Sequence, residues 1–479
     1  MSAGGASIQP DHRNLALLAA GTLFIEMMDG TIVTTSAPKI AHALGVSVGS
    51  IGLVITAYLI TQAVLIPLSG WVTARIGGRR TFIGAIIVFM LGSAGCAASA
   101  TLPELVAMRV LQGVGGAMMV PVGRTLVFSR ANPANLLRVT AMLVWPGLVA
   151  PVLAPLIGGV ITTDANWHWL FLVNLPLGVI AVAVGLRVVH PPPFDDPGRL
   201  DLTGVLLTCT GLAGLTLAAD LLAGAKVRWA LALALGIPAT LLLTLAWRHL
   251  RGVRNPLVSL SLLRIPTFRT VLTGTALYTT VTNASPFLAP LMFEQVFHWG
   301  AIKAGSVVLF IFVGNIAVKP ATTYLYSRFG FRRMLLAATL TMAAGLVLVG
   351  LTSSASPLLL IGVLMILIGV ARSVGATGQM TVIYADVPAP EMRHASTLQA
   401  TVQQLAAGTG VAASAIALRL GRPLGWMLAG GPSLHTDYSI AFVIIACVAL
   451  LASLNVLRLA PGVGDALRVG AGARRSAAG

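Results

Sequence analysis

Apolar runs of about 20 residues recur along this 479-residue chain from one end to the other. Each run is long enough to cross about 30 Å of hydrocarbon as an α-helix that rises 1.5 Å per residue. Hydrophobic residues make up 57% of the chain and charged residues only 9%, whereas a soluble domain has about 25% charged residues. A water-soluble fold of this length could not cover so much apolar surface. The sequence therefore predicts an all-α polytopic membrane protein with the lipid bilayer as its surroundings.

Fourteen transmembrane helices are expected from these runs and from the Pro, Gly and charged residues that bound them. An even number of spans places both termini on the same side of the membrane. The spans are predicted near residues 15–36, 50–69, 82–101, 104–128, 139–162, 168–187, 202–222, 229–247, 270–290, 302–322, 334–353, 357–380, 397–418 and 438–457.

The net charge of +17 is distributed unequally across the predicted topology. Of the 31 Lys and Arg residues, 22 fall in the termini and in loops on the N-terminal side, and six fall on the opposite side. The remaining three, Arg109, Lys319 and Arg372, lie inside predicted spans. Because basic loops stay on the cytoplasmic side, we expect both termini to be cytoplasmic in a multi-pass protein of the cell inner membrane. The positive charge then reflects topology, and no nucleic-acid partner is implied.

A short basic motif occurs twice, each time in a turn that follows the second predicted helix of a half. Its five residues recur 253 positions later in a single register. The matched pairs are Pro67 with Pro320, Arg75 with Arg328, Gly77 with Gly330, Arg79 with Arg332, and Arg80 with Arg333. Such a repeat predicts two six-helix bundles related by a pseudo-twofold axis, plus two inserted helices.

The Pro-rich segment near residue 190 and the basic stretch before residue 269 bracket the inserted pair. The predicted organisation has an N-terminal six-helix bundle, a region of linkers and two inserted transmembrane helices, a C-terminal six-helix bundle and a disordered cytoplasmic tail. These parts are expected at residues 1–190, 191–269, 270–461 and 462–479.

The first copy of the basic motif, within residues 70–80, resembles the loop signature G-x-L-x-D-R-x-G-R-R/K of the major facilitator superfamily. Ala74 stands where the family has Asp. The resemblance implies a gate between the two halves, whereas basic residues that merely anchor a cytoplasmic turn are the alternative interpretation. The gating residues would be Gly70, Arg75, Gly77, Arg79 and Arg80, with Arg328, Arg332 and Arg333 in the second copy.

Two further strings resemble motifs inside the spans of that superfamily. Arg109, Gln112 and Gly113 match its R-x-x-Q-G motif in the fourth span. Residues 150–159 resemble the antiporter motif G-x-x-x-G-P-x-x-G-G, with alanine at the two leading glycines. Its matching residues are Pro151, Pro155, Gly158 and Gly159. A kinked packing helix with no role in transport would have the same residues.

Residues 167–176 (WHWLFLVNLP) and 29–38 (DGTIVTTSAP) resemble strings of the fourteen-span drug:proton antiporter family. The resemblance implies a proton-coupled secondary transporter that exports amphipathic or cationic small molecules, a multidrug efflux pump, by alternating access. Its energy source would be the proton gradient, with no cofactor. A dedicated exporter, or an importer, of one endogenous metabolite, lipid or siderophore is the alternative.

An enzyme is not expected, because the chain has no recognisable catalytic motif, and none of its four lysines follows a glycine as a Walker A loop requires. We expect a monomer. Whether a periplasmic adaptor and an outer-membrane channel complete the export pathway is left open by the residues.

Glu26 and Asp29 are the acidic residues inside the first predicted span, and their spacing of three places them on one helix face. Asp29 lies about 10 Å and Arg109 about 8 Å below the outer ends of their spans, counting 1.5 Å per residue. We therefore expect an Asp29–Arg109 charge pair that faces the cavity, with Glu26 as the proton carrier. A polar pair that only joins helices is the alternative. Further polar residues predicted to line the substrate cavity, or else to hydrogen-bond between helices, are Gln62, Gln112, Asn283, Asn315 and Gln379.

Overall fold

The computed structural model describes residues 10–131, 135–164, 166–190, 198–223, 228–253, 256–429 and 433–464. Within these ranges the chain forms helices joined by turns, and no strand occurs among them. The all-α prediction is therefore confirmed, and each predicted segment coincides with one helix or with consecutive helices. The longer helices are α1 (Pro10–Ala43), α2 (Val48–Leu65), α3 (Ser69–Ile76), α4 (Gly78–Ala98), α5 (Leu102–Phe128), α6 (Leu136–Asp164), α8 (Asn174–Val188), α9 (Leu202–Ala223), α10 (Trp229–Gly252), α11 (Pro266–Gln295), α12 (Ala301–Ala317), α13 (Lys319–Phe329), α14 (Phe331–Gly350), α15 (Leu358–Val382), α16 (Met392–Ala429) and α17 (Leu434–Leu457), and the short ones include η1 (Ile66–Leu68) and α7 (Trp169–Leu172).

Among the described residues, fewer helices meet a length and composition test for membrane spans than the fourteen that the sequence predicts. Ten helices in the described part of the chain are long and apolar enough to cross a membrane, and the bent pair α12–α13 would be an eleventh. Helices α11 and α16 are not among the ten, and both present Thr, Asn or Gln side chains to an internal cavity. A helix that lines a polar cavity is less apolar than one surrounded by lipid. The number fourteen stays a prediction.

The twin motifs in the sequence form twin breaks in the structure. Pro67 is the second residue of η1, which separates α2 from α3, and Pro320 is the second residue of α13, where the helix axis bends by 54°. Gly77 (φ 87°) then separates α3 from α4, and Gly330 (φ 81°) separates α13 from α14. A residue with a Cβ rarely adopts these positive φ values, which explains the glycines. The sequence repeat is thus also a repeat of local structure.

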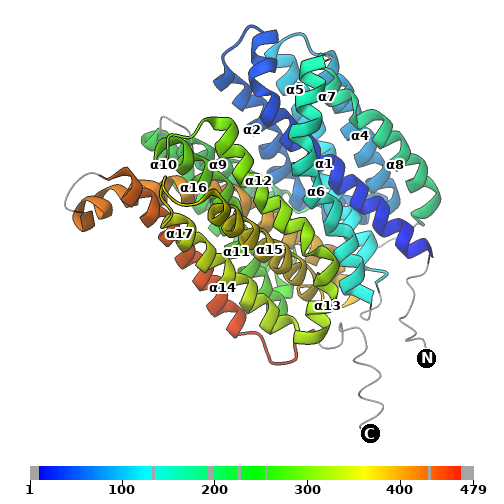
Figure 1. Ribbon diagram of the computed structural model, residues 1–479. Helices are drawn as coiled ribbons and strands as arrows, with labels where there is room; N and C mark the ends of the chain where they lie inside the picture. Colours follow the sequence, from blue (N-terminus) through cyan, green and yellow to red (C-terminus); the bar gives the residue numbers. More distant parts are fainter. Residues whose placement is uncertain are drawn as a thin grey trace, which may run out of the picture.

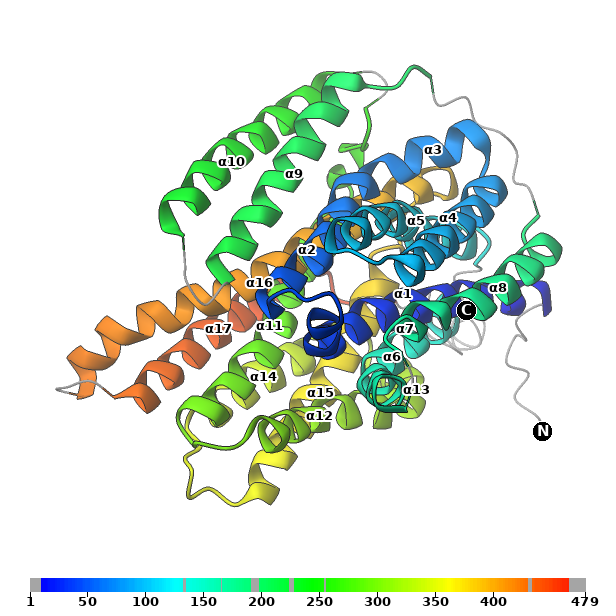
Figure 2. The same ribbon diagram turned by 90° about the horizontal axis from the view of Figure 1, so that it is seen from above.

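Helices α1 to α8 gather on one side of the molecule and α11 to α17 on the other (Figure 1). The pair α9–α10 stands beside them and packs against α2 of the first group and α16 of the second (Figure 2). The predicted boundaries at 190, 269 and 461 stay predictions. Residues 191–197, 224–227, 254–255 and 465–479, which include parts of both linkers and nearly all of the predicted tail, lie outside the described residues.

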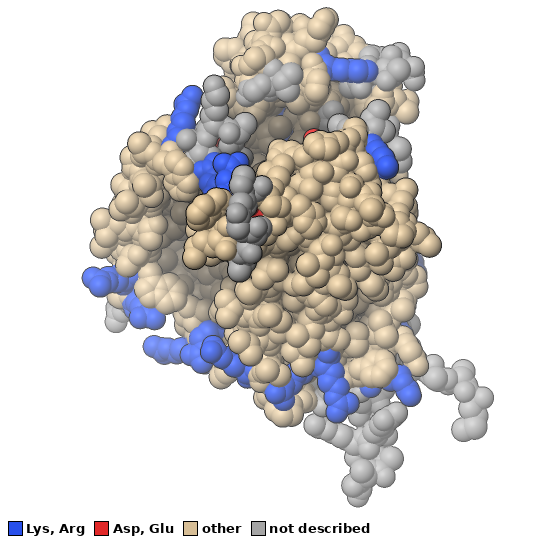
Figure 3. All heavy atoms as spheres, turned by 60° about the vertical axis from the view of Figure 1, so that its left-hand side comes forward, with Lys and Arg blue, Asp and Glu red and all other residues tan. Residues whose placement is uncertain are grey.

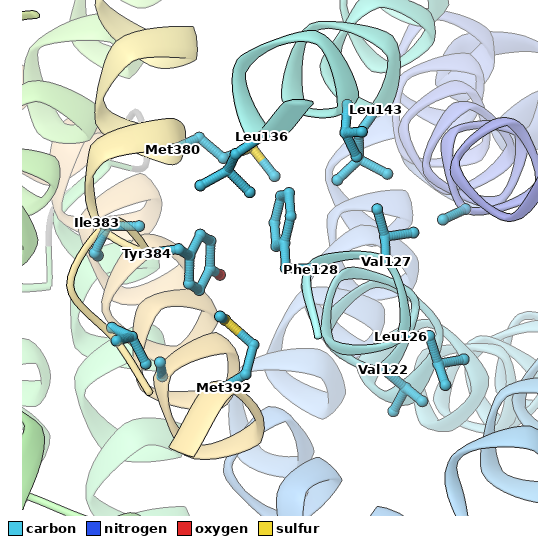
Figure 4. Packing of buried hydrophobic residues seen from close by; sticks show 14 of the residues in the cluster. Val122, Leu126, Val127, Phe128, Leu136, Leu143, Met380, Ile383, Tyr384 and Met392 are labelled. Carbon is cyan, nitrogen blue, oxygen red and sulfur yellow. The ribbon is translucent and has the colours of Figure 1, made fainter. Parts of the chain in front are cut away.

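Among the described residues, the largest apolar cluster that the two groups of helices share lies at one end of the molecule. We call this the basic end; there α1 begins, α17 ends, and the Gly77 and Gly330 turns lie. Its largest cluster joins α5 and α6 to α15 and α16, and the rings of Phe128 and Tyr384 meet across the boundary with centroids 4.6 Å apart (Figure 4). Toward the opposite, distal end, each group has a separate apolar cluster of its own.

The surface between the two ends is apolar. In Figure 3, most Lys and Arg side chains gather along the lower edge of the view and a few lie in its upper part, while the broad face between them shows almost no charged residue. The lipid-facing surfaces of α9, α10 and α15 carry exposed Leu side chains. An apolar band bounded by basic residues is the surface that a bilayer requires.

Helices α12 and α15 approach each other closely at Gly314 and Gly369. A substitution at this contact tests how the two helices pack. A Cβ at Gly369 would lie 1.9 Å from the carbonyl oxygen of Ile311, so Gly369→Ala must push the helices apart. We expect this variant to lose about 1–3 kcal/mol of stability, as overpacked cores do, seen as a lower thermal unfolding midpoint in detergent.

Gly362→Ala, in the same helix, is the matched control, because a Cβ there meets only the ring of Phe310 at 3.8 Å. Equal midpoints for the two variants would contradict the packing of α12 against α15.

Candidate functional site

A cavity of about 470 Å³ lies between the two groups of helices. Its walls come from α1, α2, α5 and α6 on one side and from α11, α12, α15 and α16 on the other. These are the first, second, fourth and fifth helices of each predicted half, so the cavity has the same pseudo-twofold character as the repeat. Its lining mixes apolar side chains with Gln, Asn, Thr and charged groups.

The predicted ion pair between Asp29 and Arg109 is present. Nη1 of Arg109 lies 2.5 Å from Oδ2 of Asp29, and both side chains are completely buried. Oδ1 of Asp29 accepts hydrogen bonds from the side-chain amides of Gln112 (2.9 Å) and Asn174 (2.8 Å). The guanidinium also stacks on the ring of Tyr58, at 4.1 Å from its centroid. The pair is therefore embedded in a network that ties α1 to α2, α5 and α8.

The expectation that the ion pair faces the cavity is wrong for Asp29, and so is the cavity position predicted for Gln112. Neither residue is among those that line the cavity. Gln112 instead accepts a hydrogen bond from Arg109 (2.7 Å) and donates one to Ser93 (3.0 Å). Residues three apart on a helix differ by about 60° in direction, which is enough for Glu26 to face the cavity while Asp29 points between the helices.

Glu26 lies on the cavity wall, as predicted, and only 8% of its surface is exposed. Its Oε1 accepts a hydrogen bond from Nε2 of Gln62 (2.5 Å), which also donates to the hydroxyl of Tyr58 (3.0 Å). Its Oε2 has no hydrogen-bond partner among the described residues. Glu26 is thus a carboxyl group at the cavity with one oxygen available to gain or lose a proton.

The other predicted cavity residues, Asn283, Asn315 and Gln379, line the cavity together with Gln62. Arg124 lines it too, although the predicted topology counts it with the loop residues. It is 7% exposed and donates from Nη1 to Oε1 of Gln403 on α16 (3.0 Å). Arg124 could have been identified as a cavity residue by its position inside the predicted span 104–128, because a charged side chain within a membrane span has a high free-energy cost.

The residues around Gly70 join the two halves at the basic end. The hydroxyls of Ser69 and Thr397 lie 3.3 Å apart, and the Ser396 hydroxyl donates to the carbonyl of Pro121 (3.0 Å). A Cβ at Gly70 would lie 2.9 Å from Oγ1 of Thr397, so this glycine permits close approach of α3 to α16.

The twin arginines of the basic motif cap equivalent helices. Nη2 of Arg79 donates to the carbonyl of Leu186 near the end of α8 (2.6 Å), and Nη2 of Arg332 donates to the carbonyl of Leu457 at the end of α17 (2.9 Å). Cations at helix C-termini satisfy free carbonyls and complement the helix dipole. The other arginines of the motif, Arg75, Arg80, Arg328 and Arg333, have exposed side chains.

The predicted antiporter motif lies within α6, which continues through both prolines. Pro151 lines the cavity, and the side chain of Pro155 is outside the described part. Gly158 and Gly159 follow near the distal end of the helix. A Cβ at Gly159 would meet no described atom within 4 Å.

The buried ion pair should be a strong determinant of stability. Asp29→Asn leaves the Arg109 guanidinium buried without a counter-ion, and breaking a buried pair in this way costs about 3–5 kcal/mol. The double variant Asp29→Asn/Arg109→Gln removes both charges and should lose less than the sum of the two single variants. Thermal unfolding in detergent measures this; losses that simply add would contradict a direct pair.

Comparison with known proteins agrees with this architecture. The family model described as Major Facilitator Superfamily matches residues 19–411. The chain is 36% identical over 412 residues to a "Putative multidrug resistance protein MdtD" of Salmonella typhimurium, with 84% of this chain and 86% of the relative covered. The same identity and coverage hold for the protein of that name from Salmonella paratyphi A.

Two solved structures share the fold. The human organic anion transporter MFSD10 (TETRAN) has a TM-score of 0.67 at 15% identity, covering 94% of this chain and all of that one. The proton:xylose symporter XylE has a TM-score of 0.63 at 14% identity, covering 97% and 98%. The chain therefore belongs to the major facilitator superfamily and is a membrane transporter, not an enzyme.

Proposed function

We propose that this transporter exports amphipathic small molecules in exchange for protons, by alternating access of one central cavity to the two sides of the membrane. The observation that carries the proposal is Glu26, the carboxyl group among the residues that line the cavity. A single acid that a substrate and a proton reach through the same cavity can couple their movements. Export, rather than import, is supported by the 36% identity to relatives named multidrug resistance proteins.

The cavity suits an amphipathic substrate. Leu23, Met27 and Phe312 supply apolar wall, and amides such as Gln62 and Gln404 supply hydrogen-bonding groups. A volume of about 470 Å³ is in the range of drug-sized ligand pockets. Transport by a monomer, a periplasmic adaptor and an outer-membrane channel stay predictions.

The conformation supports alternating access. At the basic end the halves are held together by the apolar cluster around Phe128 and Tyr384 and by the Ser69–Thr397 contact. Toward the distal end each half keeps its own cluster. If the basic end faces the cytoplasm of the cell inner membrane, as the distribution of Lys and Arg indicates, the cavity is closed on the cytoplasmic side.

Glu26→Gln tests the proton step. The amide keeps the shape of the side chain but does not ionise as a carboxyl group does. We therefore expect efflux driven by a pH gradient in proteoliposomes to fall at least tenfold while substrate binding remains. Glu294→Gln is the control, because Glu294 is exposed at the distal end of α11 and is not a cavity residue. Full gradient-driven efflux by Glu26→Gln would show that another group carries the proton.

A cross-link tests the closed contact at the basic end. In a background without Cys96, Cys209 and Cys447, the pair Ser69→Cys/Thr397→Cys should form a disulfide, since the native hydroxyls are 3.3 Å apart. Oxidation should then stop transport, and a reducing agent should restore it. Each single cysteine is the control. Continued transport by the oxidised, cross-linked protein would mean that the halves do not separate here.

A further inference from the structure

The charges on the cavity wall do not balance. The residues that line it include three arginines and one carboxylate, Glu26. Arg109 is neutralised by Asp29. Arg124 and Arg372 have no carboxylate within 4.0 Å in the described part of the chain. The lining therefore carries one excess positive charge when Glu26 is ionised and two when it is protonated.

Arg372 is held in place by a close helix crossing. Cβ atoms at Gly314 or Gly369 would lie only 2.0 Å and 1.9 Å from backbone oxygens of the facing helix, so α12 and α15 are in direct backbone contact. Arg372 follows Gly369 by three residues. Its Nη1 donates to the carbonyl of Thr282 (3.1 Å), and its Cζ lies 5.9 Å from the ring centroid of Phe312. These contacts fix the guanidinium on the second-half wall.

Two side-chain amides on the same wall have polar atoms without a hydrogen-bond partner among the described residues. Asn315 is completely buried, and neither its Nδ2 nor its Oδ1 has a partner among the described residues. Gln379, seven residues after Arg372 on α15, is 4% exposed, and its Nε2 has no described partner. Both residues line the cavity. Buried polar groups are normally paired, so unpaired donors at a cavity indicate a ligand that pairs them.

A buried lysine follows this wall along the chain. Lys319 follows Asn315 by four residues and is 6% exposed. Its Nζ donates to the hydroxyl of Thr377 (2.6 Å), with no carboxylate within 4.0 Å in the described chain. Its amino group is thus a further buried hydrogen-bond donor that contacts no carboxylate among the described residues.

We propose that Arg372, Asn315 and Gln379 form a binding site for the anionic group of an organic amphipath, such as a carboxylate or sulfonate. The guanidinium supplies charge-assisted donors and the amides supply neutral ones, while Phe312 and Met380 offer apolar wall beside them. This inference rests on the proposed export function and refines it: of the amphipathic or cationic compounds that the family resemblance implies, the transported ones are amphipathic and carry a negative charge.

Binding of three compounds with one aromatic skeleton tests the charge preference. The probes are 2-naphthoate, 2-naphthamide and 2-naphthylmethylammonium, titrated into the detergent-solubilised full chain by calorimetry. We expect naphthoate to bind tightest and the cation weakest. Arg372→Gln should weaken naphthoate binding about tenfold or more, the range for lost charged hydrogen bonds, and leave naphthamide within about threefold.

Three variants separate recognition from folding. Arg372→Lys keeps the charge and should retain more naphthoate affinity than Arg372→Gln. Gln379→Leu should weaken naphthoate without removing a charge. Arg419→Gln is the matched control, because Arg419 stacks on Trp229 (4.9 Å) and is not among the residues that line the cavity.

Tighter binding of the cation than of naphthoate, or naphthoate binding that none of the cavity variants weakens, would overturn the site. The titration needs no proton gradient. Arg372-dependent naphthoate binding without proton-driven efflux would therefore refute the export proposal alone, whereas proton-driven efflux with a preference for the cation would refute the anion site alone.

Discussion

The ion pair between Arg109 and Asp29 allows the helices of the first half of this transporter to pack around a buried charge. A guanidinium without exposure to solvent is costly in an apolar interior, and a carboxylate that meets it offsets this cost. Here the carboxylate comes from α1, the guanidinium from α5, and the amide of Asn174 on α8 completes the contact. Three helices are thereby joined through one pair of charges, so the first half is expected to move as a unit.

The second half is built differently. Its intramembrane basic residues, Arg372 and Lys319, contact a backbone carbonyl and a hydroxyl rather than any carboxylate of the described chain. The first-half wall of the cavity therefore carries both an acid, Glu26, held by Gln62, and a cation, Arg124, whereas the facing wall carries the cation Arg372 and no carboxylate among the described residues. In the proposed mechanism the two halves have different roles. The first half carries the proton and the second half binds the substrate, and proton and substrate meet in the shared cavity.

Much of this arrangement could be predicted from the sequence, because it depends on local patterns. Apolar runs predict the helices, the 253-residue repeat predicts the twin turns at Gly77 and Gly330, and charges inside spans predict the Asp29–Arg109 pair. The direction in which each side chain points around its helix axis was harder to predict from the sequence. The cavity position expected for Gln112 and Asp29 is wrong because neighbouring helices, which the sequence does not place, decide what each face meets. Arg124 was missed because it was counted with the residues of the cytoplasmic loops, although it lies inside the predicted span 104–128.

The central claim is that the two halves rock about the cavity, and distances between spin labels measure this most directly. One label pair belongs at the exposed positions Arg80 and Arg333 of the basic end, and a second at His42 and Ser354 near the distal end. As pH is lowered or substrate is added in nanodiscs, the account predicts that the basic-end distance lengthens while the distal distance shortens, in the same molecules. Distances that stay constant at both ends in a transport-competent protein, or that change in the same direction, would contradict it.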